Sequence, residues 1–214
     1  MIKHVFFDFD GVLAESVNVK TEAFRQLYLP FGSDIAEKVV AHHLAHGGMS
    51  RFEKIRIYHE NFLGSAIKNE DVLVWADRFS KLVLDGVINA PAVNGSLEFL
   101  NKFQSEFNMY IITGTPTIEI HEILKKRSWE SYFLGAYGSP EKKTHWTEYL
   151  INENNLDRTE CVFIGDATTD FDAATHSGIH FILRQTDENK CFFSDYTGPI
   201  VSDLTTLKQT IELL

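Results

Sequence analysis

The chain has 214 residues, 44% of them hydrophobic, which fits one large globular domain or a core that carries a smaller inserted one. Its formal net charge of -10 disfavours nucleic acid and anionic membranes as partners of the surface as a whole. A small anionic ligand is not excluded, because a few cations can create a local positive pocket.

The first residues show no secretory signal, since Asp8 and Asp10 interrupt the apolar run too early for the apolar region of such a signal. No later stretch approaches the roughly 20 apolar residues that cross a bilayer. Two cysteines are too few for a disulfide framework. We therefore expect a cytoplasmic protein, without a membrane or nucleic-acid partner, that exists as a monomer or a small homo-oligomer.

Short apolar runs predict strands that are buried on both faces, as in a parallel sheet. In chain order these runs are residues 4–7, 109–112, the weaker 134–137, 160–164 and 179–183. Apolar spacing predicts helices at about residues 96–106, 117–126, 143–154, 170–177 and 204–213. The alternation of strands and helices predicts an α/β fold with a doubly wound, Rossmann-like parallel sheet.

One interval breaks this alternation, because residues 16–89 contain no convincing strand. They read as helical pieces separated by Pro30, Gly32, the Gly47-Gly48 pair and Gly64. This is too much chain for the crossover helix of a βαβ unit, which has about 30 residues in all. We predict an inserted α-helical cap domain at residues 16–89 and a catalytic core formed by residues 1–15 and 90–214.

The first chemical motif is Asp8-Phe9-Asp10-Gly11-Val12, at the end of the first predicted strand. Side chains two apart on a strand share a face, so both carboxylates can point into one cleft. Open α/β sheets bind ligands at the carboxyl ends of their strands. The alternative is a strand-ending turn in which Asp and Gly serve only the loop geometry.

A second acidic motif, from Gly165-Asp166 to Asp170, follows another buried run. Asp166 falls at a strand end, while Asp170 falls on the first turn of the next helix, where a carboxylate also serves as a helix cap. Three converging carboxylates repel each other unless a cation or protons offset them. Hard oxygen ligands suit Mg²⁺, so the cluster predicts a magnesium site.

Two further strand ends can bind an anion. Thr113 and Gly114 end the second predicted strand with a hydroxyl and a backbone amide that a phosphate can approach. Lys142 and Lys143 open a helix after the weak strand, where a lysine could reach the cleft. Thr is also common in strands, and a lysine pair is commonly solvated surface, so each signal has an ordinary structural alternative.

In chain order the motifs are Asp8-Phe9-Asp10-Gly11-Val12, Thr113, the lysine of 138–143, and Gly165-Asp166 with Asp170. This series resembles the haloacid dehalogenase superfamily, in particular its helical-cap phosphatases of the phosphoglycolate phosphatase and β-phosphoglucomutase type. The resemblance implies that Asp8 is the nucleophile and, through its other oxygen, a metal ligand. Asp10 would protonate the leaving alcohol and then activate water, and its backbone carbonyl would also bind Mg²⁺. Dehalogenases lack an acid at this second position, so Asp10 favours phosphoryl transfer.

The resemblance also assigns the remaining strand-end residues. Thr113, with Gly114, and Lys143 would hold the phosphoryl oxygens. Asp166 would ligate the metal, with Asp170 supporting it. Spacing from the Gly-Ser-Pro turn at 138–140 favours Lys143 over its neighbour, but the choice between the two lysines stays open.

Within the cap, the segment from Gly47 to Arg51 looks like the substrate-specificity loop of related phosphatases and phosphomutases, with Gly48 and Arg51 as the specificity residues. The other interpretation is a helix C-cap at Gly47 and a new helix with Ser50 as its N-cap, and both can hold together.

The sequence as a whole predicts a Mg²⁺-dependent phosphatase that hydrolyses a small phosphorylated metabolite through an aspartyl-phosphate. A β-phosphoglucomutase-like phosphotransferase shares every core residue and stays an alternative. A non-catalytic binding protein on the same scaffold is a third hypothesis, because a fold alone does not establish activity.

Overall fold

The computed structural model describes residues 1–214, and its centre is a single six-stranded parallel sheet. The strands are β1 (His4–Phe7), β2 (Asn108–Pro116), β3 (Gly135–Ser139), β4 (Cys161–Gly165), β5 (His180–Arg184) and β6 (Ile200–Val201). Their order across the sheet is β3-β2-β1-β4-β5-β6, which is the order of a doubly wound α/β fold. The predicted fold class is therefore confirmed.

The central strands are apolar throughout because both of their faces are covered. In β1, Val5 and Phe7 belong to the large core cluster, while Phe6 belongs to a second cluster on the opposite face. Neighbouring residues in β4 divide in the same way, with Val162 in the first cluster and Phe163 in the second. Successive side chains on a strand point to opposite faces, so an uninterrupted apolar run is required here.

Helices cover both faces of the sheet. Buried residues of α5 (Ser96–Phe103), α6 (Thr117–Arg127) and α9 (Leu207–Glu212) join the first cluster, and those of α7 (Lys143–Glu153) and α8 (Thr168–His176) join the second. Shorter helical turns occupy Leu29–Phe31, Tyr58–Phe62, Glu130–Tyr132, Arg158–Glu160 and Lys190–Phe193. The five predicted strands and five predicted helices all appear, whereas the two-residue β6 was not predicted.

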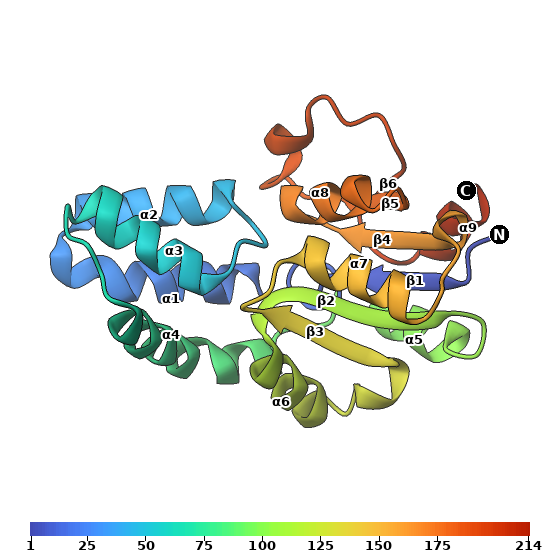
Figure 1. The fold of residues 1–214 in the computed structure, drawn as a ribbon, viewed down its shortest axis with the longest axis horizontal. Coiled ribbons are helices and arrows are strands. Elements are labelled where there is room, and N and C mark those ends of the chain that lie inside the picture. Colours follow the sequence, from blue (N-terminus) through green and yellow to red (C-terminus); the bar gives the residue numbers. More distant parts are fainter.

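Four helices fill the interval between β1 and α5, and no strand lies among them. They are α1 (Val17–Tyr28), α2 (Ser33–Ala45), α3 (Arg51–Ile57) and α4 (Asn69–Asn89). Figure 1 shows these helices together on the side to which the arrowheads of β3 and β4 point, with both chain ends on the opposite side. The helical group therefore faces the carboxyl ends of the strands. No helix combines the length and apolar character needed to cross a membrane.

Two short segments connect the helical group to the sheet, and they are paired with each other. Ala14 and Ala92 form an isolated antiparallel bridge. Beside it, the backbone N–H of Glu15 donates to the carbonyl oxygen of Pro91 at 2.9 Å. The chain therefore enters and leaves the helical group at one place.

Candidate active site

The carboxyl ends of β1 and β4 bring three acidic side chains together. Asp8 and Asp166 follow neighbouring parallel strands in which Phe7 lies opposite Ile164. Carboxylate oxygens of Asp8, Asp166 and Asp170 all lie within 4.8 Å of one another. One oxygen of Asp170 accepts hydrogen bonds from the backbone N–H groups of Asp166 (3.2 Å) and Ala167 (3.0 Å). Asp170 thus caps the start of α8 and belongs to the acidic cluster as well.

The three carboxylates of this cluster repel one another when all of them are ionised. Burial raises the pKa of Asp166 well above its usual range, and the charges of Asp8 and Asp170 raise it further. Burial also raises the pKa of Asp170 to about 7, against the opposing effect of Lys143. A divalent cation relieves such repulsion, and three carboxylates form a hard oxygen donor set that suits Mg²⁺. The residues present therefore fit a magnesium ion.

Lys143, the first residue of α7, reaches into this cluster. Its Nζ lies 2.7 Å from Asp8 Oδ2 and 2.6 Å from Asp170 Oδ1, and its side chain is buried. Burial alone would lower the pKa of Lys143, but Asp170 and Asp8 raise it above its ordinary value, so the lysine is a fixed cation. Lys142, by contrast, is exposed and borders a different surface hollow. The structure therefore brings Lys143 to Asp8.

Asp10 is held by three side chains of other segments. Lys20 Nζ and Thr115 Oγ1 both donate to Asp10 Oδ2, the latter at 3.0 Å, and Ser16 Oγ donates to Oδ1 at 2.6 Å. Burial opposes ionisation, but Lys20 and the two hydroxyls together lower the pKa of Asp10 below its usual value. Asp10 is therefore a carboxylate in this arrangement, and these contacts disfavour its protonation.

Lys20 and Thr115 are site residues that the sequence analysis did not assign. Lys20 Nζ also donates to Thr115 Oγ1 at 2.7 Å, so the two groups and Asp10 form one network. Lys20 lies on α1, and only the folding of α1 against the strand ends brings it to Asp10. Thr115 could have been found from the sequence, because it stands two residues after Thr113 on the same strand and its side chain therefore shares the same face.

Thr113 and Gly114 occupy the end of β2, beside the cap loop. Thr113 is buried, borders the cavity and accepts a hydrogen bond from the backbone N–H of Thr115 at 3.2 Å. A Cβ built on Gly114 would lie 2.6 Å from the carbonyl oxygen of Gly48, so glycine here allows the cap loop to approach the core. The sequence had suggested the approach of a phosphate as the reason for this glycine.

The loop between α2 and α3 lies against the core at Gly48. Gly48 has φ +75°, and a Cβ there would lie 2.0 Å from Thr169 Oγ1 and 3.2 Å from Lys143 Nζ. Gly48 is therefore the residue of this loop that adopts the left-handed conformation. The predicted helix cap at Gly47 is wrong by one position, because α2 has its C-cap at His46. Ser50 caps α3 as predicted, accepting from the backbone N–H of Glu53 at 3.3 Å.

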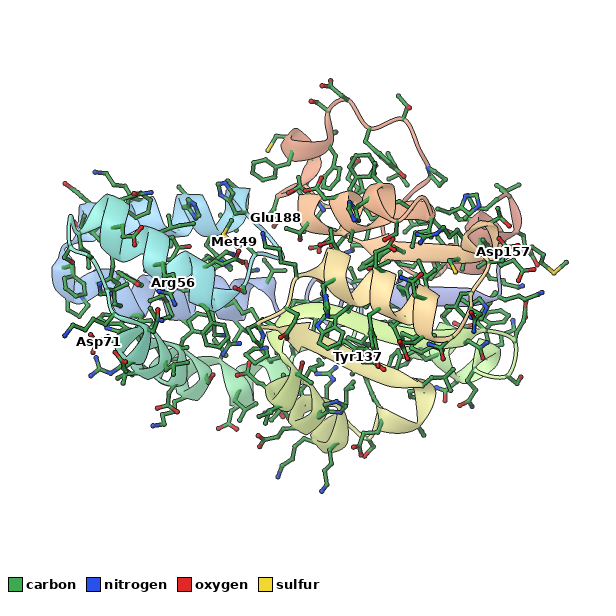
Figure 2. The ribbon with its side chains drawn as sticks, viewed as in Figure 1. Met49, Arg56, Asp71, Tyr137, Asp157 and Glu188 are labelled. Atoms are coloured by element: carbon green, nitrogen blue, oxygen red, sulfur yellow. The ribbon has the colours of Figure 1, made fainter.

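A cavity of about 280 Å³ lies between the strand ends and the helical group. Asp8, Asp10 and Asp166 border it from the core. Met49 borders it from the α2–α3 loop and Glu188 from the segment after β5, and Figure 2 shows both where the helical group meets the core. The volume fits a small metabolite.

Arg51 borders the cavity, but its guanidinium is engaged elsewhere. It makes a bidentate pair with Glu119 of α6, at 2.7 and 2.5 Å, and donates to Ser80 Oγ at 2.5 Å. The guanidinium also lies 4.7 Å from the ring centroid of Phe79. Arg51 and Glu119 are both buried, so this ion pair joins the helical group to the core.

Replacing Arg51 with alanine is expected to destabilise the protein by about 3–5 kcal/mol, because Glu119 would stay buried without its partner. Chemical denaturation of Arg51→Ala, Glu119→Gln and the double variant would measure this. The double variant is expected to lose less than the sum of the two single losses. Strict additivity would show that the pair does not couple the two parts of the molecule.

Comparison with known proteins agrees with this geometry. A family model described as haloacid dehalogenase-like hydrolase matches residues 5–184. A phosphoglycolate phosphatase from Vibrio vulnificus (strain YJ016) is 24% identical over 188 residues, which cover 83% of this chain and 81% of that protein.

Two solved structures illustrate the likeness in fold. A β-phosphoglucomutase from Clostridium difficile has a TM-score of 0.79 at 16% identity, over 100% of this chain and 98% of that one. A haloacid dehalogenase-type protein from Bacillus subtilis, solved bound to magnesium, has a TM-score of 0.71 at 14% identity, over 99% of each chain. The family match extends over most of the sequence and includes all four strand-end motifs, so the chain belongs to the haloacid dehalogenase-like hydrolases.

Proposed function

We propose that the protein is a Mg²⁺-dependent phosphatase that hydrolyses a small phosphorylated metabolite through an aspartyl-phosphate on Asp8. The observation that carries the proposal is that Asp8 and Asp10 border one small cavity, with a buried lysine on Asp8 and a hydrogen-bond network on Asp10. The curated relative named phosphoglycolate phosphatase supports the same reaction class.

In the first step, a carboxylate oxygen of Asp8 attacks phosphorus, and the bond between phosphorus and the leaving oxygen breaks. A carboxylate nucleophile is already charged at neutral pH and needs no activating base. Asp10, as the carboxylic acid, gives its proton to the leaving alcohol. Because Asp10 is ionised while Lys20 holds it, this role requires Asp10 to take up a proton and exchange the Lys20 contact for the substrate oxygen.

In the second step, water attacks the phosphorus of the aspartyl-phosphate. Asp10, now the carboxylate, accepts a proton from the water, the bond between phosphorus and Asp8 breaks, and inorganic phosphate leaves. The carboxylate form that Lys20, Ser16 and Thr115 favour suits this base step.

The remaining core residues bind the phosphoryl group and the metal. We assign the phosphoryl oxygens to Lys143, Thr113 and the backbone N–H of Gly114. Asp8, Asp166 and the backbone carbonyl of Asp10 would hold Mg²⁺, with Asp170 supporting the site. When bound, the ion supplies positive charge that offsets the phosphoryl oxygens during in-line transfer.

We further propose that residues 1–15 and 90–214 form the catalytic core and residues 16–89 the cap. In this division Gly48 and Arg51 help to select the substrate from the cap side, since both border the cavity. Because Arg51 is bonded to Glu119, selection by its guanidinium requires that the substrate share or replace that ion pair.

A screen of phosphorylated metabolites tests the function, with free phosphate and isomerised sugar phosphate measured in parallel. We expect free phosphate from a small phosphomonoester. Conversion of a sugar 1-phosphate to its 6-phosphate without release of phosphate would show that the protein is a phosphomutase and not a phosphatase. An absence of Mg²⁺-dependent turnover across the whole screen would indicate a non-catalytic binding protein.

Turnover is expected to require Mg²⁺, to stop with excess chelator and to stay low when Ca²⁺ replaces Mg²⁺. Ca²⁺ accepts more ligands at longer distances, so it could capture both oxygens of Asp8 and turn the nucleophile away from phosphorus. Initial rates with each metal at matched concentration would measure the effect. Equal rates with the two ions, or full activity in chelator, would contradict the site assignment.

A further inference from the structure

Four cations border the cavity, and three of them are neutralised by a carboxylate of the protein. Lys20 pairs with Asp10, Arg51 with Glu119 and Arg184 with Glu15. The fourth is Lys54 of α3, and no carboxylate lies within 4.0 Å of its ammonium group. Lys54 is also among the most deeply buried side chains, at 2% exposure.

The immediate surroundings of Lys54 are neutral. Its Nζ lies 2.8 Å from Nδ1 and 3.3 Å from the carbonyl oxygen of His43, and 5.9 Å from the ring centroid of Phe24. Burial lowers the pKa of His43 well below its usual value, so the imidazole is neutral and its Nδ1 accepts the hydrogen bond. An ammonium group has three N–H donors, and His43 takes two of them. The third has no partner in the protein.

A buried cation without a paired counter-charge is unfavourable. Burial, followed by the charges of Lys20 and Lys143, lowers the pKa of Lys54 to about 7, and the smaller opposing effects of Asp10 and Glu53 offset this only in part. An anionic group bound in the cavity would supply the missing counter-charge and accept the third N–H. His43 also borders the cavity, so the two residues form part of its wall on the cap side.

The donor set indicates which anion fits. A single free N–H and a single positive charge match a carboxylate, whereas a second phosphate usually draws a guanidinium fork or several N–H groups. The one cap guanidinium that borders the cavity, that of Arg51, is already bonded to Glu119. Lys54 and Asp8 border the same cavity of about 280 Å³, so one small molecule can carry both the phosphoryl group and the second anionic group.

We propose that Lys54 binds a carboxylate that the substrate carries in addition to its phosphoryl group, so that the enzyme selects short phosphorylated acids. This inference rests on the proposed phosphatase function and names its substrate class. Lys54 is a specificity residue on the cap side, and the phosphoryl chemistry stays with the core.

Two substrates of similar size, phosphoglycolate with its carboxylate and ethyl phosphate without one, would test the inference. In Lys54→Met, kcat/KM for phosphoglycolate is expected to fall by about tenfold or more, mainly through KM, because a hydrogen bond to a charged group is lost. The value for ethyl phosphate is expected to change by less than about threefold. Lys38→Met removes an exposed cap cation and is expected to leave both values unchanged.

Thermal unfolding separates recognition from a structural role. Methionine removes a buried, unpaired charge but also leaves two acceptors of His43 without their donor, so the melting temperature of Lys54→Met is expected to stay close to that of the unaltered protein. If it does not fold, Lys54→Gln, which keeps a donor but not the charge, takes its place in the kinetic comparison. Equal losses on both substrates, or no loss on either, would overturn the inference.

Binding measurements keep the two proposals distinguishable. If the unaltered protein shows no Mg²⁺-dependent turnover of any compound in the screen, the proposed function fails, and calorimetry with phosphoglycolate and ethyl phosphate then decides the role of Lys54. Preferential binding of phosphoglycolate that is lost in Lys54→Met would support the inference, and equal binding of both would overturn it. A preference for a sugar bisphosphate that depends on Lys54 would also overturn the carboxylate assignment.

Discussion

Asp8→Asn is expected to lower turnover of every phosphomonoester by roughly 10⁴-fold or more, since the amide cannot form the aspartyl-phosphate. The substitution hardly changes volume, and Asn retains the carbonyl oxygen that accepts from the backbone N–H of Phe9, a 2.7 Å bond in the structure. It also removes one of three mutually repelling carboxylates, so the fold is expected to persist. Phosphate release and thermal unfolding, measured on the same preparation, would test both expectations.

Asp172→Asn is the matched control, because Asp172 is an exposed acid on α8 and lies outside the cluster. Rapid quenching of the unaltered enzyme with labelled substrate should trap the label on protein, and Asp8→Asn should trap none. Near-normal turnover by a folded Asp8→Asn would show that water attacks the substrate directly, and the covalent route would be abandoned.

The second large effect is expected for Lys143→Met, which should lose both activity and stability. The ammonium bridges Asp8 and Asp170, and its removal leaves these buried carboxylates facing each other without a cation. Breaking a buried ion pair by removing one partner costs about 3–5 kcal/mol. Loss of a fixed charge beside the phosphoryl oxygens is expected to lower kcat by about 10²–10³-fold.

Unfolding of Lys143→Met with and without Mg²⁺ would identify the source of the lost stability. If repulsion within the cluster is the cause, Mg²⁺ should raise the melting temperature of the variant more than that of the unaltered protein. Lys142→Met serves as the control, because that neighbouring lysine is exposed. If the two variants had equal turnover and equal melting temperatures, Lys143 would have no role in the active site.

Local sequence patterns predicted the sheet and the residues at its strand ends. Residues 4–7 were predicted as a strand and form β1, because a fully buried strand must be apolar at every position. Asp8 and Asp166 follow from the same reasoning, since each stands directly beyond such a run. β6 has only two residues and carries no pattern of its own, so it could not be predicted.

Contacts between distant segments could not be predicted in this way. Lys20 and Asp10 are ten positions apart, and Arg51 and Glu119 are 68 apart, so each pair depends on how the helices pack against the strand ends. The sequence therefore suggested Arg51 only as a substrate-specificity residue, whereas in the folded chain its guanidinium is paired with Glu119. The charges of residues 53–60 predict a solvated helix face that includes Lys54, and this is wrong for Lys54, which is buried beside His43 once α2 and α3 are packed.

The paired connections at Ala14 and Ala92 bear on which phosphorylated molecules can be substrates. The two connections lie side by side, so they tie the helical group to the core at one edge, and the buried pair of Arg51 with Glu119 ties it at a second place. With the Gly48 carbonyl lying against Gly114, the space between the two parts is a cavity of about 280 Å³. We therefore expect a phosphorylated protein side chain or a polynucleotide to be hydrolysed far more slowly than a small phosphomonoester, because either would have to separate these contacts to reach Asp8.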